Sequence, residues 1–108
     1  MSDPVPAIGY VRVNTARVMT ESDAQRAAIE SWAARTGHLI VDWVEDILVP
    51  GEAGANDVAL NELIERVQRG VASVVAVDGA SRVSRNKAVY DLWVARLAEA
   101  GGSVQLTQ

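Results

Sequence analysis

The sequence predicts an α/β fold with three layers, in which a mostly parallel sheet of four to five strands carries helices on both faces. Three observations lead to this prediction: short β-rich runs alternate with segments of helical periodicity, glycines close those helical segments, and residues 71–77 are almost continuously apolar. Such an order is typical of parallel sheets with crossover helices, and a strand that is apolar throughout fits the sheet interior.

The first half of the chain divides by local pattern. Short strands are expected at residues 7–13 and 38–44. A helix is expected between them over residues 22–36, because Ser22 and Gln25 have the spacing of a capping box and a glycine follows the last helical residue. The residues expected to face inward from this helix are Ile29, Trp32 and Ala33, with Ala28 beside them.

The second half follows the same rules. Its expected elements are loop 45–56, helix 57–69, strand 71–77, loop 78–85, helix 86–100 and strand 103–107. The last helix is expected to turn inward its apolar residues, which are Val89, Leu92, Trp93, Leu97 and Ala100. Functional sites in open parallel sheets lie outside the carboxyl ends of the strands, which here are residues 14–17, 45–54 and 78–85.

Composition narrows the class of protein. The 108 residues fit one domain, expected over residues 7–108 after a disordered lead-in at 1–6 that holds two prolines. A net charge of −4 excludes a generally basic DNA-binding surface, so any DNA contact must come from a local arginine cluster. Cysteine is absent and no apolar run is long enough for a membrane span, so we expect a cytoplasmic protein with no cofactor and no metal.

Motifs at the strand ends carry a resemblance. Residues 10–15 read Y-V-R-V-N-T, Gln25 lies on the following helix, Asp46 and Gly51 precede a helix with Leu60, and residues 81–85 read S-R-V-S-R. In order and spacing, over residues 7–107, the chain resembles the catalytic domain of serine recombinases of the resolvase/invertase family, whose motifs read Y-x-R-x-S-T, D…SG…R-P-x-L and D-R-L-S-R. The resemblance implies a resolvase-like fold with flavodoxin-like topology. It also implies a serine that attacks a DNA phosphate held by arginines.

Three positions depart from that family pattern. Asn14 stands where the family has its nucleophilic serine, Asp57 where it has an arginine, and Ser81 where it has an acid. An amide cannot form the phosphoester intermediate, and a carboxylate repels the phosphate that an arginine would bind. We therefore predict an inactive member, a pseudoenzyme. Its remaining candidate phosphate-binding residues are Arg12, Gln25, Arg82 and Arg85.

The resemblance implies a binding or regulatory role in DNA recombination, with an active recombinase or another protein as partner and weak or no DNA binding alone. The alternative to such a partner is assembly with further copies of the same chain. We expect neither the dimerisation helix nor the DNA-binding domain of relatives in this chain. One alternative is a residual DNA-cleaving subunit that uses another nucleophile, such as Thr15 or Ser84, or that works with an active partner. Another is a protein-interaction module unrelated to DNA. The arginines themselves could instead form ion pairs within the fold, and the acids considered are Asp46, Asp57 and Asp78.

Overall fold

The computed structural model describes residues 3–14, 18–48 and 57–107. Its elements, in chain order, are β1 (Val5–Asn14), α1 (Val18–Thr36), β2 (His38–Leu48), α2 (Asp57–Gln68), β3 (Val74–Val77), the 3-10 turn η2 (Ala80–Arg82), α3 (Lys87–Glu99) and β4 (Ser103–Leu106). Within these residues, no helix is both long and apolar enough to cross a membrane.

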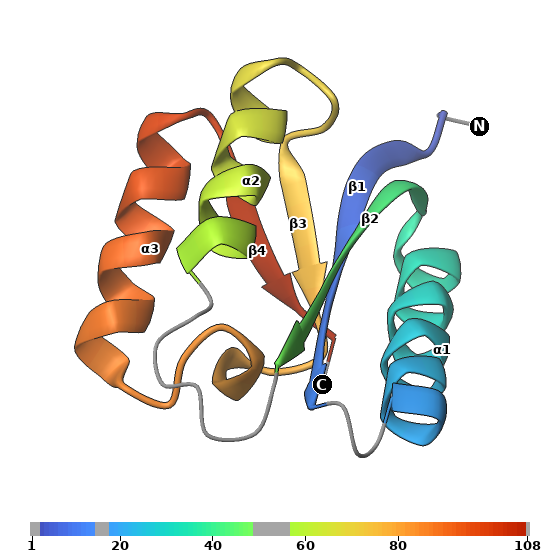
Figure 1. The fold of residues 1–108 in the computed structure, drawn as a ribbon. Helices are drawn as coiled ribbons and strands as arrows, with labels where there is room; N and C mark the ends of the chain where they lie inside the picture. Colours follow the sequence, from blue (N-terminus) through green and yellow to red (C-terminus); the bar gives the residue numbers. More distant parts are fainter. Residues whose placement is uncertain (1–2, 15–17, 49–56, 108) are drawn as a thin grey trace.

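The sheet confirms the predicted fold class. Its four strands lie in the order β2-β1-β3-β4, and all three neighbouring pairs are parallel. This is the start of the flavodoxin-like order 2-1-3-4-5. Helix α1 covers one face, and α2 and α3 cover the other (Figure 1). Because the strands are parallel, the ends of β1, β2 and β3 meet at one edge of the sheet.

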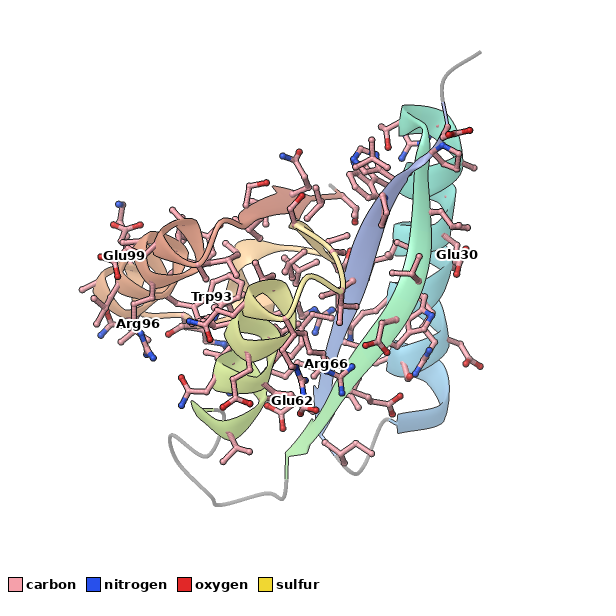
Figure 2. The ribbon with its side chains drawn as sticks, turned by 90° about the horizontal axis from the view of Figure 1, so that it is seen from above. Glu30, Glu62, Arg66, Trp93, Arg96 and Glu99 are labelled. Atoms are coloured by element: carbon pink, nitrogen blue, oxygen red, sulfur yellow. The ribbon has the colours of Figure 1, made fainter. Side chains whose placement is uncertain are left out.

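Alternation along β1 divides the interior into two cores. Ala7 and Val11 face α1, where they pack with Ile29, Trp32 and Ala33 as predicted. Ile8 and Tyr10 face the other side and join the core beneath α2 and α3. Trp93 fixes that second core, because its Nε1 donates a 3.2 Å hydrogen bond to the carbonyl of Leu60 on α2. Figure 2 shows Trp93 directed from α3 towards α2.

The strands β1 and β2 are longer than predicted. Strand β1 begins at Val5, so the expected disordered lead-in is wrong for Val5 and Pro6. The reason is pairing: the Val5 amide donates to the Gly37 carbonyl at 2.9 Å, and Val5 lies opposite His38. At the other end β2 continues to Leu48, because β1 supplies a partner for each residue from Asp42 to Leu48, the last being the Asn14–Leu48 pair.

Helix α1 does not begin at the predicted capping box. It starts at Val18, and Ser22 and Gln25 are buried within it. The prediction was wrong because Gln25 uses its amide on the backbone of Arg12 in β1 and not on the first turn of its own helix. The polar pair therefore marks a contact between helix and sheet.

Two predictions for the second half also need correction. Strand β3 begins at Val74, three residues later than expected. On α3, Trp93 and Leu97 are buried as predicted, but Leu92 is 63% exposed and Val89 is 43% exposed. Residues four apart share one helical face, so the stripe through Trp93 and Leu97 faces the sheet and leaves Leu92 outside it. Val89 lies on the same stripe, but in the first turn of α3, where it is only partly covered.

Candidate functional site

Arg12 on β1 supports the loop that follows β3. Its Nη1 donates hydrogen bonds to the backbone carbonyls of Arg82, at 3.2 Å, and Val83, at 2.8 Å. Two motifs about 70 residues apart in the sequence thus meet at the carboxyl edge of the sheet, as the sequence predicted. The guanidinium of Arg12 is, however, directed at carbonyl oxygens of the chain itself, and among the side chains that the structure describes it forms no ion pair with Asp46 or Asp78.

Gln25 holds the same strand residue from the other face of the sheet. Its Oε1 accepts from the Arg12 amide and its Nε2 donates to the Arg12 carbonyl, both at 3.0 Å. The side chain is 1% exposed. Both ends of the amide are therefore used inside the fold, which makes Gln25 a residue that positions Arg12.

Tyr10 on β1 and Asp46 on β2 form a hydrogen-bonded pair near the end of β1. The Tyr10 hydroxyl donates to Asp46 Oδ2 at 3.3 Å, and the ring is fully buried. Burial and then the Asp46 carboxylate raise the pKa of Tyr10, so the phenol stays protonated. Asp46, which matches the acid of the family's D…SG…R-P-x-L stretch, thus accepts a hydrogen bond from a neutral phenol.

Arg82 on η2 is paired with Asp78, one of the acids considered as an internal partner. The distance from Arg82 Nη2 to Asp78 Oδ2 is 3.4 Å, which is long for a charge-assisted hydrogen bond. The Asp78 side chain is 13% exposed, and its other oxygen, Oδ1, is buried without a hydrogen-bond partner in the described part of the chain. Arg82 is therefore only loosely held.

Arg85 differs from the other candidate arginines. It is exposed, and its side chain has no ion pair or hydrogen bond with the residues that the structure describes. It lines an open pocket of about 630 Å³ between the η2 loop and the first turns of α3. The other lining residues are Ala80, Ser81, Ser84, Lys87, Tyr90 and Asp91.

The three altered positions lie at the same edge of the sheet. Asn14 is the last residue of β1, Asp57 opens α2, and Ser81 lies exposed on η2. Of the two alternative nucleophiles, Thr15 is outside the described residues. The Ser84 hydroxyl oxygen accepts a 3.0 Å hydrogen bond from the Asn86 amide, in the turn that leads into α3.

Sequence reasoning found the arginines but missed the pocket. Lys87, Tyr90 and Asp91 belong to no motif and reach the S-R-V-S-R loop only because α3 begins directly after it. Asn86 sets that start by accepting hydrogen bonds from the amides of Ala88, at 2.9 Å, and Val89, at 3.2 Å. The sequence feature that could have indicated the pocket is Asn86, because a helix-capping asparagine at this position places the first turn of α3 against the loop. In the described part of the chain, no group of three acidic, histidine or cysteine side chains could hold a metal ion.

Three solved structures of catalytic domains share this fold. The chain is similar to the C-terminal catalytic domain of ISC1926 TnpA, an IS607-like serine recombinase, with a TM-score of 0.78 and 17% identity over 96% of this chain and 68% of the other. It is also similar to the N-terminal catalytic domain of TP901-1 integrase, with a TM-score of 0.76 and 20% identity over 94% and 76%. The C-terminal catalytic domain of IS1535 TnpA, another IS607-like serine recombinase, gives 0.72 and 19% over 93% and 69%. The fold is thus that of serine-recombinase catalytic domains.

The sequence itself gives the family. Residues 7–108 match the family described as resolvase, N-terminal domain, and the chain therefore belongs to it. Comparison with curated proteins gives no match. The resemblance drawn from the strand-end motifs is confirmed at the level of the family.

Proposed function

We propose that this chain is a resolvase-family domain that binds DNA phosphate without cleaving it and acts in a binding or regulatory role. The observation that carries the proposal is the unequal use of the four candidate residues. The side chains of Arg12 and Gln25 form hydrogen bonds inside the fold, whereas Arg85 is exposed and has no partner among the described residues. Arg85 is the phosphate contact in this proposal, and Arg82, which pairs with Asp78, is a second candidate that this pairing keeps from the phosphate.

The proposed loss of cleavage rests on the altered positions. Asn14 offers no hydroxyl to attack a phosphate, Asp57 adds a negative charge at the carboxyl edge, and Ser81 removes an acid. We expect Asn14→Ser alone to form no covalent DNA adduct, because two further positions remain altered. The measurement is a denaturing gel of the variant incubated with radiolabelled duplex. A phosphoserine-linked adduct on that gel would contradict the proposal.

A partner belongs to the same proposal. The net charge of −4 opposes approach to DNA, so a single exposed arginine, Arg85, supports only weak binding. An active recombinase that carries its own DNA contacts is the partner that fits this charge balance.

Fluorescence anisotropy with a labelled duplex tests the DNA contact directly. At low salt we expect Arg85→Ala to lower the affinity about tenfold and to reduce the salt slope by about 0.9, the contribution of one phosphate contact. Arg35→Ala is the matched control, since it removes the same charge from an exposed site on α1, far from the loop. Absence of duplex binding at low salt, or an equal loss for both variants, would contradict the proposal.

A further inference from the structure

We propose that the pocket between η2 and α3 takes one nucleotide of an unpaired DNA strand, with the phosphodiester at Arg85 and the base against Tyr90. The inference rests on the proposed DNA contact at Arg85 and deepens it by naming the form of DNA that is bound. The juxtaposition that carries it is a cation without a partner among the described residues, an aromatic ring and two serine hydroxyl groups around one open cavity.

The size and walls of the pocket suit a nucleotide. Its volume of about 630 Å³ falls within the range of small-molecule sites, roughly 300–1,000 Å³. The loop supplies one wall through Ser81, Ser84 and Arg85, and the first two turns of α3 supply the other. A flat ring can therefore enter between the loop and the helix while its phosphate stays at the rim beside Arg85.

The charge of the pocket selects a ligand with one negative charge. Lys87 and Asp91 neutralise each other, since Lys87 Nζ lies 2.6 Å from Asp91 Oδ2. With Arg85, the three charged lining residues sum to +1 (two cations and one anion). A phosphodiester carries a single negative charge and balances this sum. A nucleoside triphosphate brings more charge than the pocket balances and meets Asp91 as well.

Tyr90 provides the surface for the base. Its ring is partly buried and packs against the core formed under α2 and α3, so its position is fixed. Burial and then the Asp91 carboxylate raise the pKa of Tyr90, so the ring stays neutral near physiological pH. Aromatic side chains of this kind stack on bases with little sequence preference.

The hydroxyl groups are placed to contact the edge of the base. Ser84 Oγ accepts from the Asn86 amide, which leaves its own proton free to donate. Ser81 is exposed on the same wall and carries no charge that would repel a phosphate. A paired base lies inside the duplex stack and cannot enter such a cavity, so the ligand is an unpaired nucleotide.

The test compares a fluorescein-labelled single-stranded oligothymidine with a duplex of the same length, and uses free thymidine monophosphate as competitor. We expect tighter binding of the single strand than of the duplex. Tyr90→Leu is expected to lower single-strand affinity about tenfold with little effect on the duplex, while Tyr90→Phe keeps the wild-type affinity. Ser81→Asp is expected to weaken single-strand binding severalfold, and Ser81→Asn, its neutral counterpart of similar size, much less.

The outcomes separate this inference from the proposed function. Duplex binding that depends on Arg85, together with a single-strand affinity that neither Tyr90→Leu nor Ser81→Asp changes, overturns the nucleotide pocket and leaves the proposed function intact. Absence of Arg85-dependent binding to either DNA overturns both. If thymidine monophosphate binds as tightly as the oligonucleotide, the ligand is a free nucleotide and the assignment to a DNA strand fails. The Ser81 pair decides the matter alone should Tyr90→Leu not fold.

Discussion

The end of β1 and the pocket beside α3 lie at the same edge of the sheet but are built in opposite ways. At the strand end, the Tyr10 hydroxyl, Arg12 Nη1 and the Gln25 amide are all hydrogen-bonded within the protein. At the pocket, Arg85 is exposed and without a described partner, and Ser81 is exposed. Residues that resemble one family's catalytic set have thus separated into a structural group and an open group.

A residue that matches a family motif therefore does not necessarily keep the role that the family gives it. Arg12 and Arg85 both match phosphate-binding positions in the resemblance. Arg12 donates to two backbone carbonyls, whereas Arg85 is exposed and has no hydrogen bond with the residues that the structure describes. Substitutions at the strand end should therefore act on stability, and those at the pocket should act on binding.

The largest expected effect is at Gln25. We expect Gln25→Leu to lower the free energy of unfolding by about 3 kcal/mol, because it leaves the buried N–H and C=O of Arg12 without partners. Urea denaturation followed by circular dichroism measures this. Arg85→Ala is the comparison and should stay within about 0.5 kcal/mol of the wild type. Similar losses for the two variants would mean that the strand end and the pocket do not differ as described.

Arg12→Ala should have the next largest effect. It removes two hydrogen bonds from a charged donor to the carbonyls of Arg82 and Val83, which are worth about 2 kcal/mol together. The loss should be local. Hydrogen exchange should therefore accelerate at the amides of Val83 and Ser84, which bond the Ala80 carbonyl, more than in the strands. Uniform acceleration across the protein would contradict a local role for Arg12.

The fold was largely predictable from the sequence, because alternation of strands and helices is a local pattern. The apolar strand at β3 and the capping residue Asn86 were likewise visible in short windows of sequence. What could not be read locally was which polar residue bonds which. Gln25 has the spacing of a helix cap, and only its distant contact with Arg12 reveals another use.

The candidate site divides in the same manner. Its arginines were found through motifs, and their positions along the loop were correct. The partners were not predictable, since Arg12 reaches carbonyls 70 and 71 residues away and Arg82 takes Asp78, only one of the three acids considered. The pocket went unpredicted because Tyr90 and Lys87 acquire meaning only when α3 is folded against the loop.

A pH dependence follows from Tyr10. Its pKa is raised in the folded protein by burial and by Asp46, so the unfolded chain loses this proton at a lower pH than the folded chain. The stabilising contribution is therefore complete below about pH 10, the ordinary value, and falls above it by up to about 1.4 kcal/mol per pH unit. Urea denaturation between about pH 8 and about pH 11, a range that spans the ordinary tyrosine pKa, measures the slope. Tyr10→Phe should flatten it, whereas Tyr90→Phe, on the less buried tyrosine, should leave most of it in place.

The smallest expected change in the free energy of unfolding is at Asp78, the acid that pairs with Arg82. Asp78→Asn removes a carboxylate that has one buried oxygen without a partner and only a 3.4 Å contact to Arg82. We expect a change within about 1 kcal/mol in the free energy of unfolding, because a loosely paired charge that is mostly buried contributes little net stability.

The same substitution should release Arg82 from its ion pair with Asp78, so that its guanidinium becomes available to a ligand as that of Arg85 is. Without the Asp78 charge its guanidinium can reach a phosphate beside Arg85, so we expect duplex affinity to rise severalfold and the salt slope to steepen by about 0.9, one further contact. Asp23→Asn makes the same charge change at an exposed site on α1 and serves as the control. Anisotropy titrations that give equal gains for both variants would mean that net charge alone governs the affinity. A gain confined to Asp78→Asn would show that internal pairing, and not the motif, decides which arginine can bind DNA.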